Sequence, residues 1–298
     1  MTGFASTEAL NAALDAAAWP NRQSSRAVGA GGLRWHVQIL GSGPACLLLH
    51  GTGASTHSWR DVAPLLARHM TVIVPDLPGH GFTDVPKPQD MTLPGMSRLV
   101  RSLLETLELD PQLAIGHSAG AAILTRMSLD RPGKLKLIVA VNGAMLPFGG
   151  PFRFLYPALA RMMLLNSLTK HVLARRARSE KAVADLIAGT GSSIDEQGLA
   201  GYTALFRDPE HVGATLRMMA QWDLQSLNAD FPKLTSDLVL IATGADRAVP
   251  ADQAFKVKEL VPKGKVIYLR DLGHLAHEER PQMIADLILQ EAKSRSLL

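Results

Sequence analysis

The stretch LAIGHSAGA at residues 113–121 places Ser118 between two glycines, after a short apolar run and before the helix-like segment AAILTRMSL. A strand, a sharp turn and a helix in this order present a serine hydroxyl at the start of the helix, where the helix dipole favours developing negative charge. The pattern is short, and Ser118 could equally be a small residue in an ordinary turn. The chemistry that it suggests is nucleophilic attack on a carbonyl carbon.

A serine hydroxyl is a poor nucleophile until a base removes its proton, so this interpretation requires a histidine and an acid that orients it. The sequence offers Asp246 in LVLIATGADRAVP and His274 in KVIYLRDLGHLAHEERP. Each follows an apolar run, so both are expected at the sheet edge where Ser118 emerges. Asp246 could instead be a turn-forming acid, and His274 an ordinary loop histidine. We predict a catalytic triad of Ser118, Asp246 and His274, with the rival base His277 in a supporting role in the following helix.

Acyl transfer also needs N–H donors for the developing oxyanion. The amide of Ala119, the residue after the nucleophile, supplies one donor. The HGTGA turn after ACLLL supplies the other, for which we predict Thr52. His50 and Gly51 are expected to shape that turn, and Gly53 is a reserve donor. The HGTGA sequence alone would also fit an ordinary strand-to-helix turn. We name His50, Gly51 and Gly53 as candidate substrate-binding residues because the GHSAG motif is present in the same chain.

Short apolar runs alternate with helix-like segments, which indicates an α/β fold with a mainly parallel sheet flanked by helices. The expected strands are LRWHVQIL (33–40), ACLLLHG (45–51), TVIVPD (71–76), LAIGH (113–117), LKLIVAVN (135–142), LVLIATG (238–244) and KVIYLRD (265–271). The long stretch between LKLIVAVN (135–142) and LVLIATG (238–244) has helical periodicity. We therefore predict a core formed by residues 1–146 and 234–298, with an inserted helical cap, or lid, at 147–233.

The chain of 298 residues has 31 basic and 27 acidic side chains, and a net charge of +4 is too small to indicate nucleic acid as a partner. A single cysteine, Cys46, excludes an intramolecular disulfide and is expected to be buried. Segment 1–20 is alanine-rich but has no basic start, so we expect a surface helix rather than a signal peptide. No apolar run reaches the roughly 18 residues of a spanning helix. We expect a soluble protein of the cytoplasm, with peripheral membrane contact as an option.

Common metal and nucleotide motifs are missing from the sequence. It has no CxxC pair, no HExxH, no GxGxxG and no GxxxxGK[ST]. We therefore expect no protein-bound metal and no cofactor, and ATP-driven chemistry is disfavoured.

The motifs HGTGAS, DLPGHGFTD, GHSAG, GADRAVP and GHLAHEERP resemble those of the α/β-hydrolase superfamily in order and spacing, over residues 30–295. The resemblance implies the α/β-hydrolase fold, with Ser118 as nucleophile, His274 as general base and then acid, and Asp246 as its orienting partner. Some relatives place the acid after the strand that here ends in Asn142, whose amide cannot hold an imidazolium by charge. Asp246 is therefore preferred. A dehalogenase is disfavoured because its nucleophile would be an aspartate.

Within that superfamily, the chain looks most like the hydrolase-like accessory proteins of magnesium chelatase in bacteriochlorophyll biosynthesis. The resemblance rests on LRWHVQ, LLLHGTGASTHSWRDVAPLLA, PDLPGHGFTD, GHSAGAAIL, HVGATLRMMAQWDL and GHLAHEERP. It implies a role in pigment formation for photosynthesis, with a porphyrin or pigment ester as substrate and magnesium chelatase as a partner. Two hypotheses follow: a serine hydrolase that cleaves an ester through an acyl-enzyme, and a non-catalytic porphyrin-binding or chelatase-assisting protein that retains the scaffold.

The first part of the predicted cap, residues 147–181, is basic, and Glu180 is its single acidic residue. Its basic residues are Arg153, Arg161, Lys170, Arg175, Arg176, Arg178 and Lys181. They could form a solvated helix face, or they could bind porphyrin propionates or an anionic membrane surface. A second set could supply an apolar wall for a ring ligand or simply pack in the core: Trp59, Met218, Met219 and Trp222. We include these four among the candidate substrate-binding residues.

Overall fold

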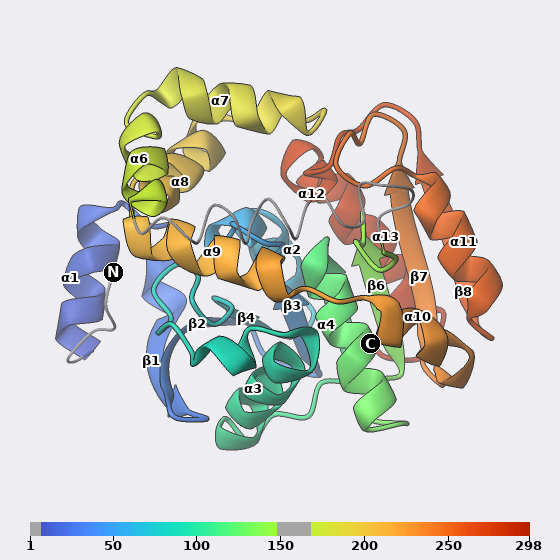
Figure 1. Ribbon diagram of the computed structural model, residues 1–298. Helices are drawn as coiled ribbons and strands as arrows, with labels where there is room; N and C mark the ends of the chain where they lie inside the picture. Colours follow the sequence, from blue (N-terminus) through green and yellow to red (C-terminus); the bar gives the residue numbers. More distant parts are fainter. Residues whose placement is uncertain (1–6, 148–167) are drawn as a thin grey trace.

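The computed structural model describes residues 7–147 and 168–298 (Figure 1). Within them, an eight-stranded sheet has the order β1-β2-β4-β3-β5-β6-β7-β8. The strands are β1 (Ser25–Ala30), β2 (Leu33–Leu40), β3 (Ala45–Leu49), β4 (Thr71–Pro75), β5 (Leu113–His117), β6 (Leu137–Val141), β7 (Asp237–Thr243) and β8 (Gly264–Leu269). β2 pairs antiparallel with β1 and β4, and every other neighbouring pair is parallel. The predicted α/β fold with a mainly parallel sheet is confirmed.

Two cores lie on the two faces of this sheet. Along β3, Leu47 and Leu49 belong to one cluster, while Cys46 and Leu48 belong to the other, because successive side chains of a strand leave opposite faces. Cys46 is a buried free thiol, as predicted. Helices cover the first cluster with α3 (Leu93–Thr106), α4 (Ala119–Asp130) and α11 (Asp252–Leu260), and the second with α2 (Val62–Leu66) and α13 (Pro281–Lys293). Burial on both faces explains why these strands are continuous apolar runs in the sequence.

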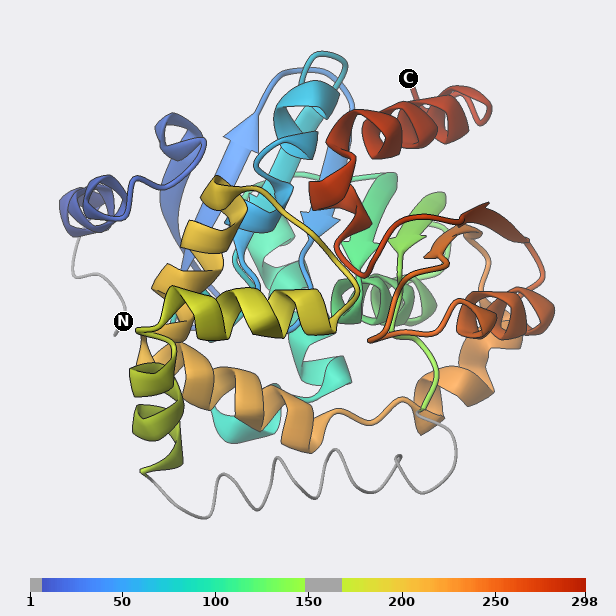
Figure 2. The same cartoon turned by 90° about the horizontal axis from the view of Figure 1, so that it is seen from above.

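Between β6 and β7 the described chain is helical, with α6 (Thr169–Arg176), α7 (Glu180–Gly189), α8 (Glu196–Phe206), α9 (Pro209–Gln221) and α10 (Gln225–Asp230). Helices α6 to α9, which we call the cap helices, form a layer beside the sheet in both views (Figures 1 and 2). α10 contacts α4 instead, and its Leu227 belongs to the first core cluster. The end of the predicted cap range thus packs with the layer around the sheet.

The alanine-rich segment at the start of the described chain forms α1 (Thr7–Ala16). One side of this helix is buried, because Leu10 and Leu14 pack in a cluster with Phe82 and with Leu205 of the cap helices. Among all helices that the structure describes, none has the length and apolar character needed to cross a membrane.

Candidate active site

Ser118 lies in the turn between β5 and α4. Its backbone has φ 50° and ψ −118°, a conformation that residues other than glycine rarely adopt. A Cβ at Gly116 would lie 2.4 Å from the nitrogen of Ala121. A Cβ at Gly120 would lie 2.4 Å from the carbonyl oxygen of Leu49. The backbone is therefore so close on both sides of the serine that only glycine fits.

Asp246 and His274 come together from the loops that follow β7 and β8. His274 Nδ1 donates to Asp246 Oδ2 at 2.8 Å. The other carboxylate oxygen, Oδ1, accepts the backbone N–H groups of Ala248 at 2.7 Å and Val249 at 2.8 Å. Both side chains are buried. Because Nδ1 carries the proton that faces the carboxylate, Nε2 of His274 is left as an acceptor.

A cavity of about 940 Å³ opens beside this pair, and both Ser118 and His274 line it. No direct hydrogen bond joins the Ser118 hydroxyl to the imidazole among the interactions of the described residues. Such contacts are often long before a ligand is bound. The cavity is at the upper end of the range of about 300–1,000 Å³ that is typical of small-molecule sites.

The two predicted oxyanion donors line the same cavity as the serine. Ala119 is the first residue of α4, where a helix leaves its N–H groups without partners inside the helix. Thr52 lies in the turn after β3, and its hydroxyl donates to Met218 Sδ at 3.9 Å. The side chain of Thr52 is thereby turned toward the cap helices, while its backbone remains beside the elbow.

The candidate substrate-binding residues divide into two groups. Gly51, Gly53, Met219 and Trp222 line the cavity. Three others do not lie among the lining residues that the structure describes: His50, Trp59 and Met218. Trp59 and Met218 are fully buried in the second and first core clusters, so their apolar side chains pack rather than face a ligand.

His50 holds the turn rather than the ligand. Its Nε2 accepts the N–H of Leu77 at 2.9 Å, which leaves Nδ1 to donate to the carbonyl of Gly51 at 2.8 Å. Burial lowers the pKa of His50 to about 3, so the ring is neutral near pH 7. The predicted role in shaping the HGTGA turn agrees with this geometry, and the predicted ligand contact does not.

The described basic residues of the first cap segment differ in their surroundings. Lys170 pairs with Glu210, and Lys181 pairs with Asp185 on the same helix. Arg176 lines the cavity. The remaining described members, Arg175 and Arg178, are exposed, and Arg153 and Arg161 lie outside the described residues.

His277 is removed from the cavity. It lies in α12 (Ala276–Glu279), is fully buried, and its Nε2 is 2.7 Å from the hydroxyl oxygen of Ser58. Burial lowers the pKa of its imidazole well below the usual value. Its ring packs against His117, whose ring in turn packs against His274. The expected supporting role fits this position.

Three polar side chains that the sequence analysis left without a role hold the loop of His274. His117, Asn142 and Thr243 bond to the carbonyl groups of Gly273 and His274. Each lies at the carboxyl end of a neighbouring strand: the last residue of β5, the residue after β6 and the last residue of β7. In the sequence, each of these residues is a polar residue at the carboxyl end of an apolar run, and this pattern could have indicated a role near the active site.

The turn 190–192 between α7 and α8 contacts both loops of the Asp246–His274 pair. Arg247 donates its backbone N–H to the carbonyl of Thr190 at 3.0 Å. Leu275 donates its backbone N–H to Ser192 Oγ at 2.8 Å. The cap helices are therefore fastened directly to the two loops.

No group of His, Cys, Asp or Glu side chains among the described residues has the geometry of a metal site. Within the described residues, the site consists of a serine in an elbow turn, a histidine–carboxylate pair and the backbone of Thr52 and Ala119 around a largely apolar cavity.

The chain matches the Alpha/beta hydrolase family over residues 46–287 and belongs to that family. It is 38% identical over 273 residues to the magnesium-chelatase 30 kDa subunit of Rhodobacter capsulatus, which covers 91% of this chain and 95% of that protein. The predicted resemblances are confirmed by these two matches.

Solved structures agree on the fold. Epoxide hydrolase CorEH has a TM-score of 0.78 at 22% identity, over 91% of this chain and 98% of its own. An alpha/beta hydrolase fold protein from Burkholderia ambifaria has a TM-score of 0.75 at 25% identity, over 89% of this chain and 97% of its own.

Proposed function

We propose that this protein is a serine hydrolase that cleaves an ester through an acyl-enzyme, with Ser118, His274 and Asp246 as its catalytic triad. The observation that carries the proposal is the 2.8 Å bond from His274 Nδ1 to Asp246, beside a serine held in a strained elbow turn. The bond orients the ring so that Nε2 is available as a base on the side of the shared cavity.

In the proposed reaction, His274 Nε2 takes the proton of Ser118 as the serine oxygen attacks the ester carbonyl carbon. The backbone N–H groups of Thr52 and Ala119 stabilise the oxyanion of the tetrahedral intermediate. His274 then gives its proton to the leaving alkoxide, and the acyl group remains on Ser118. His274 then takes a proton from a water molecule as the water oxygen attacks the acyl-enzyme. It returns this proton to the Ser118 oxygen as the ester bond to the serine breaks, which releases the acid and restores the serine.

The cavity favours a large apolar substrate with an anionic group. Most of the described residues that line the cavity are apolar. Among them, Arg176 is the single side chain that carries a positive charge at every physiological pH. Asp185 and Asp223 also line it. Asp185 is paired with Lys181, whereas Asp223 accepts the N–H of Gln225 and keeps its charge, so the anionic group of the substrate is expected beside Arg176. We propose a porphyrin or pigment ester with a free carboxylate as substrate, in bacteriochlorophyll formation, since the R. capsulatus relative is a magnesium-chelatase subunit.

The test is to treat the purified protein with a fluorophosphonate probe and to locate the adduct by peptide mass spectrometry. A working triad is expected to label Ser118 in the native protein and to lose that labelling in His274→Ala. Ser193→Ala, a change at an exposed serine, is the matched control and should label normally. Absence of labelling in a folded native protein would refute serine hydrolase chemistry.

The relationship to a magnesium-chelatase subunit favours a second candidate function, a porphyrin-binding protein that assists magnesium chelatase without catalysis. In that case Ser118→Ala should leave magnesium insertion unchanged. Porphyrin binding should still quench the fluorescence of Trp222, which lines the cavity. A cytoplasmic location and contact of Arg175 and Arg178 with an anionic membrane belong to both candidates. Loss of magnesium insertion in Ser118→Ala would contradict the non-catalytic role.

A further inference from the structure

Two consecutive carbonyl groups in the loop of His274 are bound by buried side-chain donors. The carbonyl of His274 accepts Asn142 Nδ2 at 3.0 Å and His117 Nε2 at 3.0 Å. The carbonyl of Gly273 accepts the same Asn142 Nδ2 at 3.0 Å and Thr243 Oγ1 at 2.9 Å. Asn142 therefore bridges both carbonyls, and all of these side chains are buried.

The partners determine which end of the Asn142 amide faces the loop. Its Oδ1 lies 3.0 Å from the backbone nitrogen of Thr243, which can only donate. Its Nδ2 lies against two carbonyl oxygens, which can only accept. The amide thus links the end of β7 to the His274 loop. An ionised carboxylate at this position would place lone pairs against both carbonyls.

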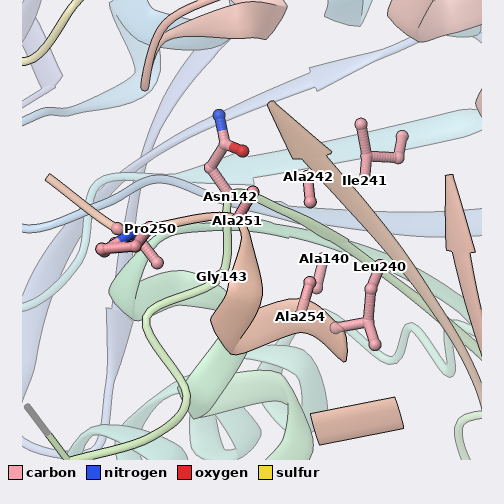
Figure 3. A pocket seen from close by; sticks show the side chains of 10 residues that line it. Ala140, Asn142, Gly143, Leu240, Ile241, Ala242, Pro250, Ala251 and Ala254 are labelled. Carbon is pink, nitrogen blue, oxygen red and sulfur yellow. The ribbon is translucent and has the colours of Figure 1, made fainter. Parts of the chain in front are cut away.

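The backbone at Asn142 favours this residue type as well. Its φ is 46°, in the left-handed region that asparagine, aspartate and glycine occupy more readily than other residues. Its N–H donates to the carbonyl of Ile241 at 2.8 Å. Figure 3 shows its side chain extending from the end of β6 beside the β7 residues Ile241 and Ala242. The side chains drawn there line a small cavity of about 10 Å³, which is distinct from the one that Ser118 lines.

We propose that Asn142 is a positioning residue for His274, which holds the main chain of the base through its two N–H bonds so that the ring meets Asp246 and Ser118. The proposal rests on the triad proposed above. It also gives a reason why this position, where an acid could stand after the strand, carries an amide: the loop that it faces needs donors.

Two variants separate this role from general structural support. Asn142→Gly removes the whole side chain but keeps the left-handed backbone. Asn142→Asp keeps the shape and the oxygen that Thr243 uses, but replaces the two N–H donors. Ser128→Ala is the matched control, because this buried hydroxyl bonds to Ser236 and does not contact the His274 loop.

The first readout is the rate of fluorophosphonate labelling at Ser118 at pH 8, with p-nitrophenyl ester hydrolysis beside it. We expect both Asn142 variants to react about 10- to 100-fold more slowly, with kcat reduced and KM little changed, since misplaced catalytic groups lose rates of this order. Asn142 does not belong to the described lining of the large cavity, which is why KM should be spared. Normal labelling of Asn142→Asp would overturn the inference, because that variant keeps the shape of the side chain but replaces both N–H donors with an oxygen that faces the two carbonyls.

The second readout does not depend on activity. The Nδ1 proton of His274, hydrogen-bonded to Asp246, is followed by NMR and assigned by its loss in His274→Gln. We expect this resonance to broaden or disappear in both Asn142 variants and to persist in Ser128→Ala. If the native protein fails to label, the proposed hydrolase function fails, and this spectrum still decides the role of Asn142. An unchanged resonance in the variants would refute it.

Discussion

Asp246 uses both oxygens of its carboxylate, and this sets the protonation pattern of its neighbour. Oδ1 accepts two backbone N–H groups, so it must remain an acceptor, and Oδ2 faces His274 Nδ1. The histidine is thereby fixed in the tautomer whose Nε2 can take a proton. The tautomer of His274 thus depends on Asp246 acting as an acceptor in all three hydrogen bonds.

Asp246→Asn should therefore abolish most activity without unfolding the protein. Its oxygen would stay on the two backbone N–H groups, and its NH₂ would face His274 Nδ1. That nitrogen would have to accept, so the ring proton would move to Nε2, where it cannot act as a base. We expect labelling of Ser118 to slow by about 10³-fold or more. The rate of probe labelling, beside the circular dichroism spectrum, checks this, and a rate within tenfold of the native one would contradict it.

The sequence could not decide which apolar residues face the ligand. Met218 and Met219 are neighbours on α9, and successive helical residues point about 100° apart. One methionine therefore lies in the core and the other in the cavity, although the letters are the same. Asp246 and His274, in contrast, could be located because parallel strands end at a common edge.

At the scale of elements, the seven expected strands all occur, within one or two residues at most ends. The five central strands β3 to β7 could be predicted because strands buried on both faces are apolar nearly throughout. β1 was not predicted, since its residues SRAVGA are mostly small or polar and it lies at the edge of the sheet. The Gly31–Gly32 dipeptide between β1 and β2 was the available signal for a hairpin. The division into core and cap remains a prediction.

The cap helices place Arg176 at the cavity without an acidic partner. It forms no ion pair with any residue that the structure describes, and residues 1–6 and 148–167 contain no aspartate or glutamate. Its exposed neighbour Arg175 does not line the cavity among the described residues. An exposed arginine that lines a largely apolar cavity, with no acidic partner among the described residues, favours a substrate with a carboxylate.

Arg176→Gln is expected to raise KM about fivefold for esters that carry a free carboxylate, a change equivalent to about 1 kcal/mol, because the arginine is exposed and water screens its charge. A neutral ester of the same length should be unaffected. Arg175→Gln serves as the matched control with normal KM for both. The comparison of the two esters is the measurement, and an equal effect on both would show that charge is not recognised.

At the scale of the whole molecule, buried neutral histidines lower the free energy of unfolding at acidic pH. Burial, as the largest cause, lowers the pKa of six of them: His50, His57, His80, His117, His211 and His277. The values reach about 3 for His50 and His80 and about 4 for His211, from 6.5. Between pH 6.5 and these values the unfolded chain binds more protons than the folded one.

Stability should therefore be level between pH 7 and pH 8 and fall from about pH 6.5 downward, by on the order of 2 kcal/mol at pH 5 for each of His50, His80 and His211, with His57, His117 and His277 acting in the same direction. Glu278, whose pKa is raised by burial, acts in the opposite direction, but it is one group against six. Since a domain has only about 5–15 kcal/mol in total, unfolding should begin near pH 5. Urea unfolding at pH 8, 7, 6 and 5 measures this. Equal midpoints at pH 7 and pH 5 would refute it.

The contact between the turn 190–192 and the two loops bears on how this scaffold can be re-engineered. A Cβ at Gly191 would lie 1.9 Å from the carbonyl oxygen of Ala245, and one at Gly273 would lie 2.3 Å from that of Gly191. The turn 190–192 and the loops of Asp246 and His274 therefore pack so closely that neither Gly191 nor Gly273 has room for a side chain. A cap transplanted from another scaffold must bring a glycine to this contact, or it will push apart the loops that carry Asp246 and His274.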